Sequence, residues 1–141
     1  MVTPLSAQNI SKSFGNEQIL YNLSVDLREH ETLSILGRSG CGKTTLLKIL
    51  GGLEVADQGK VLIEDTDIQE LSPQNRDVVY LYQEALLFPH LNVFENIAFG
   101  LRLRKVSETE ITQRVEKLIR KLELSGMKDK MPHQLSGGEK Q

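Results

Sequence analysis

The eight residues GRSGCGKT at 37–44 constrain the fold of this chain more than any other stretch. They follow the pattern G-x-x-x-x-G-K-[ST], in which glycines let the backbone bend so that its N–H groups point inward. The segment TLSILG at 32–37 is nearly continuous in apolar residues and predicts a buried strand. The segment KTTLLKILGGL at 43–53 predicts a short helix closed by Gly51-Gly52. Strand, loop and helix in this order predict a site that binds phosphate.

Each residue type in this loop has a physical reason to contact a nucleotide. Lys43 would reach the β- and γ-phosphates, and Thr44 would offer its hydroxyl to Mg²⁺. Cys41 is interpreted as a small residue at a variable position rather than a reactive thiol. Arg38 has two open interpretations, a phosphate contact or a side chain in solvent. The residues of this stretch expected to bind nucleotide are Gly37, Arg38, Ser39, Gly40, Cys41, Gly42, Lys43, Thr44 and Thr45.

Composition limits the function classes that remain. The chain has 141 residues, 39% of them apolar and 26% charged, as in soluble globular proteins. A net charge of −2 argues against a general nucleic-acid or anionic-membrane binder. The single cysteine excludes an internal disulfide and fits a reducing compartment. The start MVTPLSAQN lacks the features of a signal peptide, and no apolar run is long enough to span a bilayer. We therefore expect a cytoplasmic protein.

The rest of the first half predicts strands. LSAQNISKSF at 5–14 and QILYNLSVDLRE at 18–29 mix alternation with β-branched residues, and Gly15-Asn16 predicts a turn between them. GKVLIEDTDI at 59–68 alternates and breaks at an acidic turn, which predicts one arm of a hairpin. RDVVYLYQ at 76–83 predicts another buried strand.

The second half predicts helices. NVFENIAFGL at 92–101 is expected to be helical. SETEITQRVEKLIRKLEL at 107–124 is the clearest helix, and Ser107 and Glu110 have capping-box spacing. The side chains expected to form its apolar face are Ile111, Val115, Leu118, Ile119 and Leu122.

Four features in a fixed order resemble the ATP-binding-cassette (ABC) family, specifically the ATPase subunits of bacterial importers. Phe14 lies 23 residues before Gly37, where the family has an aromatic that stacks on adenine. The phosphate loop follows. Gln83 matches the glutamine loop, and EALLFPHLNVFENIAFGL at 84–101 resembles the importer sequence after it. LSGGE at 135–139 resembles the signature that names the family. Each of these features also has a plainer interpretation. Phe14 could be a core residue, Gln83 a solvated side chain, and LSGGE a turn before a helix.

The resemblance implies ATP and Mg²⁺ as cofactors. Lys43 and Gln83 would be the catalytic residues, and Thr44 and Gln83 the metal ligands, with Gln83 also holding the attacking water. The signature would bind the γ-phosphate held by a second ATPase subunit, so that two chains pair head to tail. Its contacts would come from Ser136, Gly137, Gly138 and Glu139, with Glu139 standing where Gln is more usual.

The resemblance also implies partners and a location. Membrane-spanning permease subunits would contact 84–101, which includes Phe88-Pro89-His90, and nucleic acid is not expected. The chain would lie in the cytoplasm, peripheral on the inner face of the plasma membrane. In the family, the Walker B Asp and Glu and the switch His follow the signature, and none of them can be placed in this sequence. His133 precedes the signature, so it does not match the switch His. We expect a truncated piece of a longer ATPase that binds ATP but hydrolyses it poorly, with unpaired strand edges that favour strand exchange between chains.

The expected fold class is α/β. It is a P-loop NTPase (ABC ATPase) fragment with an N-terminal antiparallel β subdomain, a partial RecA-like core and a helical subdomain. Residues 1–83 would form the β and P-loop part, 84–135 the helical signalling part, and 136–141 the start of the signature helix. The function would be ATP binding and hydrolysis coupled to solute uptake. A non-transport ABC-class ATPase and a non-catalytic nucleotide-binding regulatory module are the alternatives.

Overall fold

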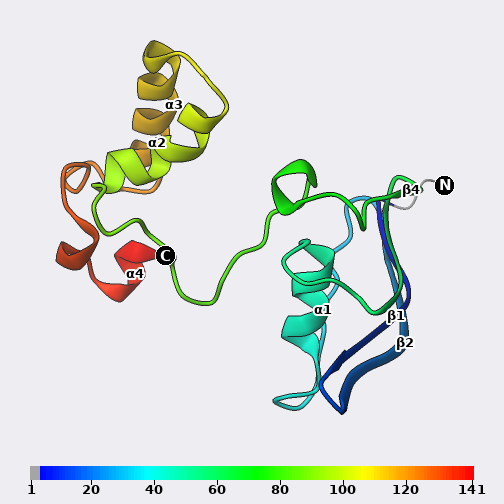
Figure 1. Cartoon of the computed structure of the whole chain (residues 1–141). Coiled ribbons are helices and arrows are strands. Elements are labelled where there is room, and N and C mark those ends of the chain that lie inside the picture. The colour runs from blue at the N-terminus through cyan, green and yellow to red at the C-terminus, as the bar shows by residue number, and fades with distance from the viewer. Residues whose placement is uncertain (1–3) are drawn as a thin grey trace. The chain divides into compact units, whose positions relative to one another are not determined.

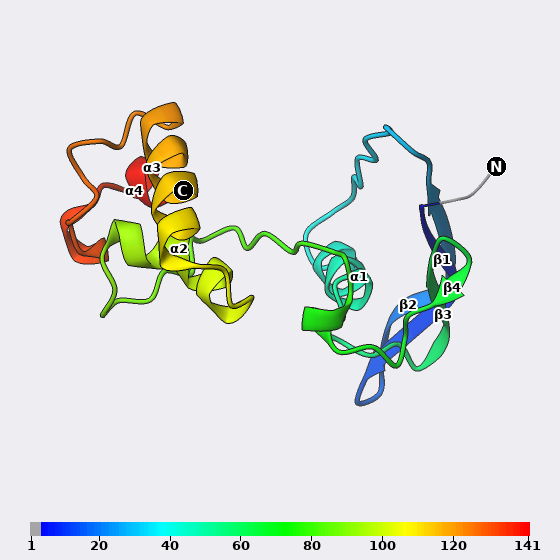
Figure 2. The same ribbon diagram turned by 90° about the horizontal axis from the view of Figure 1, so that it is seen from above.

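The structure, a computed structural model, describes residues 4–141 and divides into two units. The first unit ends at Leu81, and the second covers Tyr82–Gln141. Figures 1 and 2 show the sheet and helix α1 in the first unit and helices α2, α3 and α4 in the second. Each unit has its own hydrophobic core, and we describe each by itself.

The first unit is built on a four-stranded sheet in the order β2-β1-β3-β4, in which every pair is antiparallel. Strands β1 (Leu5–Phe14) and β2 (Glu17–Leu27) join at the predicted turn, where Gly15 has a φ of +59°. Strands β3 (Gln58–Ile63) and β4 (Thr66–Asp67) form a hairpin around the acidic turn, so the segment 59–68 holds both arms of a hairpin and not the single arm predicted. The antiparallel β prediction is therefore confirmed.

Helix α1 (Lys43–Leu50) packs on one face of this sheet (Figure 1). Strands β1 and β3 supply the sheet side of the core, where Ile10 and Val61 are fully buried. The helix supplies the other side from positions three and four residues apart. The buried core residues of this unit are Ala7, Ile10, Leu20, Leu46, Ile49, Leu50, Ala56, Val61 and Ile68.

Two predicted strands, 32–37 and 76–83, are not strands in the structure. A buried strand needs neighbours that pair with its backbone N–H and C=O groups. Among residues 4–141, no strand pairs with either segment. Leu36 in the first segment is 91% exposed, and Leu81 in the second is 85% exposed. The prediction was wrong because apolar composition indicates where a strand would be stable without supplying its partner strands.

Arg76 is a buried charged side chain that ties the segment after β4 to the end of α1. Its Nη1 donates to the carbonyl oxygens of Ile49 at 2.9 Å and Leu50 at 3.3 Å. Its Nε donates to Leu71 and its Nη2 to Gln69, both carbonyls at 2.9 Å. The last carbonyls of a helix have no partner within the helix, so a guanidinium there satisfies them and the negative helix end. Burial lowers the pKa of the Arg76 guanidinium.

The second unit packs α2 (Val93–Leu103) against α3 (Glu108–Lys121). Asn92 caps α2 with a complete capping box, and Ser107 caps α3 as predicted by accepting from the Glu110 N–H at 3.3 Å. Their fully or nearly fully buried residues are Ala98, Ile111, Val115 and Ile119. Short helices η1 (Pro73–Asn75, first unit), η2 (Pro132–Gln134) and α4 (Gly137–Lys140) complete the elements of the described residues.

Two residues of the predicted apolar face of α3 are not in this core. Leu118 is 40% exposed and Leu122 is 54% exposed. The core stripe runs through Ile111, Val115 and Ile119, four residues apart, because only α2 and the segments flanking the two helices cover α3 here.

Replacing Arg76 with Met should remove four hydrogen bonds to carbonyl oxygens, two of them buried. We expect Arg76→Met to lower the free energy of unfolding of the first unit by about 2–4 kcal/mol. The measurement is the urea midpoint at unchanged m-value. The control is Arg28→Met, which removes the same charge from an exposed position. Equal midpoints for the two variants would contradict this account of the helix end.

Candidate phosphate-binding site

A cleft of about 380 Å³ lies between the turn end of the sheet and the start of α1. β1 contributes its last residue, β2 contributes a residue near its start, and the glycine-rich loop closes the other side. The lining residues are Phe14, Ile19, Ser39, Gly40, Gly42, Lys43, Thr44 and Thr45. The structure therefore brings Phe14 to the loop that follows it by more than twenty residues. Gly37, Arg38 and Cys41 belong to the same loop but do not line the cleft.

Lys43 is held over the loop by the loop's own backbone. Its Nζ donates to the carbonyl oxygens of Gly37 at 2.8 Å and Arg38 at 2.7 Å, and lies 3.7 Å from the Cys41 Sγ. These are neutral acceptors. A phosphate oxygen is a charged acceptor and forms a stronger bond with an ammonium group, so a phosphate in the cleft would compete for Lys43.

The loop reaches the helix through a residue that has to be glycine. Gly42 has a φ of +92°, which side-chain-bearing residues rarely adopt, and it is buried. A Cβ there would lie 2.7 Å from the Leu20 Cδ2 and 3.0 Å from the Ile19 Cγ2. This close approach to β2 fixes where α1 begins and which way its N-terminal N–H groups point.

The start of α1 is available to an anion. Gly42 is the N-cap, and no side chain caps the helix there. The first turn contains no acidic residue to compete for the helix N–H groups. The exposed Thr44 hydroxyl is beside them in the cleft. Loop, lysine and helix start therefore fit a phosphate group.

A divalent cation would have few protein ligands here. Within residues 4–141, no group of three or more His, Cys, Asp or Glu side chains could hold a metal ion. Thr44 and Thr45 carry the hydroxyl groups of the first helical turn that line the cleft, and Ser39 adds a hydroxyl from the loop. This donor set fits Mg²⁺ that takes most of its ligands from water and phosphate oxygens.

Sequence reasoning missed a charged cluster beside Phe14. Lys12 Nζ donates to the Val55 carbonyl at 2.7 Å, to Glu54 Oε1 at 2.9 Å and to Asp57 Oδ1 at 3.3 Å. The hydrogen bond with Glu54 raises the pKa of Lys12 and lowers the pKa of the Glu54 carboxyl. The sequence did contain an indication of this cluster. Lys12 lies two residues after Ile10 on the predicted strand, and residues two apart on a strand point to the same face, here the buried one.

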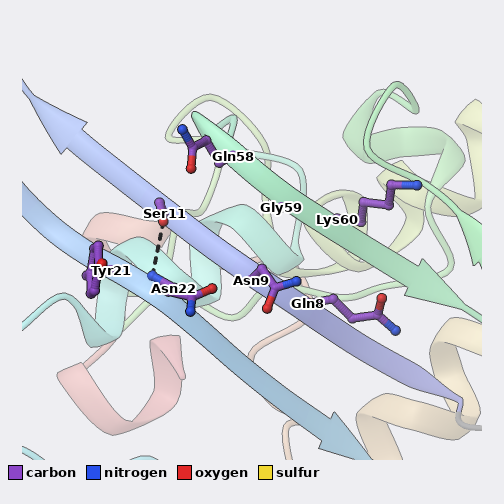
Figure 3. A pocket seen from close by; sticks show the side chains of 8 residues that line it. All are labelled: Gln8, Asn9, Ser11, Tyr21, Asn22, Gln58, Gly59 and Lys60. Atoms are coloured by element: carbon purple, nitrogen blue, oxygen red, sulfur yellow. Dashed lines mark hydrogen bonds between the residues drawn. The ribbon is translucent and has the colours of Figure 1, made fainter.

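A larger cleft of about 470 Å³ lies on the other face of the sheet (Figure 3). It forms where β1 and β2 shift register and where Asn9 and Asn22 adopt positive φ. Figure 3 shows amide side chains from β1, β2 and β3 around it, with the Ser11 hydroxyl accepting from the Asn22 N–H at 3.0 Å. None of the residues predicted to bind nucleotide lines it.

Gln83 and the signature residues belong to the second unit. Gln83 is exposed, and its carbonyl accepts from the Gln141 side chain at 3.4 Å. Ser136 caps α4, and its N–H donates to the Glu139 carboxylate in a complete capping box. That hydrogen bonding lowers the pKa of Glu139. A capping box accepts Glu or Gln equally, which gives the Glu at this position a structural role.

The importer-like segment packs on α2. The Phe88 ring lies 4.3 Å from the Phe99 ring, and the His90 ring meets Phe88 edge-on at 6.0 Å. The Asn96 side chain accepts from the Phe88 N–H at 2.8 Å and donates to the Leu91 carbonyl at 2.8 Å. These contacts fix 88–91 on the start of the helix.

A family model described as ABC transporter matches residues 20–141. The chain belongs to the ABC transporter family. Similar curated proteins include the spermidine/putrescine import ATP-binding protein PotA of Thermotoga maritima, 50% identical over 137 residues, and that of Vibrio cholerae, 48% identical over 132 residues. The sn-glycerol-3-phosphate import ATP-binding protein UgpC of Bordetella avium is 41% identical over 138 residues. The matches cover 94–97% of this chain and 35–38% of these relatives.

A solved structure supports the same assignment. The dimeric, post-hydrolysis ATP-binding cassette MJ0796 bound to ADP and Pi matches with a TM-score of 0.83 at 28% identity. The match covers 96% of this chain and 65% of that one. The predicted α/β P-loop fragment with an antiparallel β part and a helical part is confirmed. No helix within residues 4–141 has the length and apolar character needed to cross a membrane.

Placing a methyl group on Gly42 should displace the loop from β2. We expect Gly42→Ala to weaken MgATP binding at least tenfold, because the helix start can no longer keep its position beside Leu20. Isothermal titration calorimetry measures the effect. Gly100→Ala is the control, since a Cβ at Gly100 in α2 meets nothing within 4 Å. Unchanged affinity in Gly42→Ala would contradict the proposed close approach.

The Lys12 cluster should make stability depend on pH. The Glu54 and Asp57 carboxyls have lowered pKa values, through Lys12 for Glu54 and the Ser13 N–H for Asp57. Their contribution is therefore fully present above the unfolded pKa of about 4 and is lost as pH falls through the lower folded values. We expect Tm to fall less steeply from about pH 5 to about pH 3 in Glu54→Gln than in wild type. Glu17→Gln, an exposed control on β2, should match wild type.

Proposed function

We propose that this chain is part of the ATP-binding subunit of an ABC-type membrane importer and that its first unit binds MgATP. The observation that carries the proposal is the cleft in which Phe14 and the glycine-rich loop face one space. The names of the similar curated proteins support the importer assignment.

Different parts of the cleft would bind the base and the phosphates of ATP. Phe14 is 49% exposed and offers an aromatic surface to the adenine base, a contact worth about 1–3 kcal/mol by analogy with base stacking. The loop N–H groups, the start of α1 and Lys43 would hold the phosphates. The residues of this stretch that line the cleft would thus act as one anion site, with Thr44 directed to Mg²⁺; they are Ser39, Gly40, Gly42, Lys43, Thr44 and Thr45.

ATP would supply the reacting phosphoryl group, and Mg²⁺ would offset its charge. Lys43 would stabilise the charge on the transferring oxygens, and Gln83 would orient the attacking water. The lining of the cleft contains no Asp, Glu or His among the described residues. A missing general base costs about 10²–10⁴-fold in rate, so we expect this chain to retain ATP and turn it over slowly.

The signature residues are available for a contact with a second subunit. A Cβ at Gly137 or Gly138 would meet nothing within 4 Å, so neither glycine is required by packing within its own unit. We infer that Ser136, Gly137, Gly138 and Glu139 approach the γ-phosphate of ATP in a head-to-tail partner. The dimeric state of MJ0796 supports this proposal.

We further propose that 84–101 contacts membrane-spanning permease subunits on the cytoplasmic face of the plasma membrane. Phe88 is 39% exposed although it packs on Phe99, which leaves apolar surface for a partner. The names of the relatives support small organic solutes, polyamines first, as the proposed substrate class.

A second candidate is a non-catalytic nucleotide-binding module, favoured by the absence of a carboxylate in the described lining of the cleft. A non-transport ABC-class ATPase is less favoured. Some such proteins insert long coiled coils between the glutamine loop and the signature, and only 51 residues separate Gln83 from Leu135.

Removing the loop lysine tests the phosphate site. We expect Lys43→Ala to weaken MgATP binding about 10- to 100-fold, the loss of one or two charge-assisted hydrogen bonds. The control is Lys48→Ala, which removes a lysine from the other end of α1. Calorimetric titration compares the two variants with wild type. Equal affinity in all three would refute binding at this loop.

Turnover tests whether this chain lacks a general base. If the chain is part of an importer ATPase and lacks the general base, the native chain should bind ATP. Its rate of phosphate release should then be no higher than that of Lys43→Ala. Turnover that depends on Lys43 would show that a base exists within this sequence.

A further inference from the structure

Lys12 is almost fully buried although it lies two residues from the exposed Phe14 on the same strand. Only 11% of its side chain is exposed, and its Nζ stands over the Phe14 ring at 5.2 Å from the centroid. That distance is within the range of a cation–π contact. One part of the ring surface is therefore already in contact with a fixed charge.

The charge is fixed because three oxygen atoms hold it. Glu54, Val55 and Asp57, in the segment between α1 and β3, accept from Nζ at 2.7–3.3 Å. Asp57 also accepts from the Ser13 N–H at 2.7 Å through its second oxygen. The segment that leaves α1 is thus tied to the two residues that precede Phe14.

The Phe14 ring has two neighbours that matter for a ligand. The Lys12 Nζ lies over the ring, and the ring lines the cleft together with Gly40, Lys43 and Thr44, so a base in the cleft would stack on the part of the ring that the ammonium leaves free. The ammonium is paired with carboxylates and is directed away from solvent, so it is not itself a phosphate ligand.

We propose that Lys12 is a positioning residue that holds the Phe14 ring for one-sided stacking of a purine base. The proposal rests on the nucleotide-binding function proposed above. Lys12 acts through Phe14 and touches neither the phosphates nor the metal. Its contribution should depend on the base of the ligand and be absent for a ligand that has only phosphates.

The experiment compares MgATP with magnesium tripolyphosphate on the whole chain. We expect Lys12→Met to weaken MgATP binding about three- to tenfold and to leave tripolyphosphate binding within about twofold of wild type. Lys12→Arg keeps a cation that can stack on the ring, and it should restore most of the ATP affinity.

Lys60→Met is the matched control for charge. Lys60 is an exposed lysine on β3 that lines the other cleft, so its removal changes the net charge equally without touching Phe14. It should bind both ligands as wild type does.

The outcomes are distinct. Equal losses for ATP and tripolyphosphate would assign Lys12 a general structural or electrostatic role and overturn the proposal, as would unchanged ATP binding. A wild-type chain that binds neither ligand would instead refute the nucleotide-binding function. A loss confined to ATP, rescued by Arg, supports one-sided stacking.

Discussion

The contact of Gly42 with β2 is the constraint on which the site depends. Because the backbone passes within van der Waals distance of Leu20 and Ile19, α1 starts directly beside the turn end of the sheet. The same turn end carries Phe14. A residue with a side chain at this position would separate the helix start from the aromatic ring, and the cleft would lose one of its two walls. Local backbone geometry, rather than any single polar contact, therefore places the glycine-rich loop and the Phe14 ring around one cleft.

The two clefts of the first unit show why the choice of a candidate site has to rest on the charge and chemistry of the lining as well as on cleft volume. The cleft on the face of the sheet away from α1, here called the outer cleft, is the larger, and neutral amide side chains surround much of it (Figure 3). The smaller cleft has a lysine ammonium, an uncapped helix start and an aromatic ring. A ligand that joins an anionic group to an aromatic base would be stabilised by all three features of the smaller cleft. Volume alone would have selected the face of the sheet opposite to the one that we propose binds nucleotide.

The sequence predicted the parts of the fold that local pattern determines. The β1–β2 hairpin follows from alternation and a Gly-containing turn, α3 from its period and Ser107, and the loop from its glycines. The segments 32–37 and 76–83 were predicted incorrectly because a strand requires a partner that composition does not specify. Lys12 and Arg76 were missed for a related reason. Their burial depends on carbonyls and carboxylates that come from other segments of the chain.

The central claim is that MgATP occupies the cleft between Phe14 and the loop. Amide hydrogen–deuterium exchange of the chain with and without MgATP tests it directly, because bound phosphate protects the N–H groups that face it. The account predicts slower exchange in peptides covering 37–46 and unchanged exchange in those covering 58–63. Protection confined to the β3 side of the outer cleft, with none at 37–46, would contradict it.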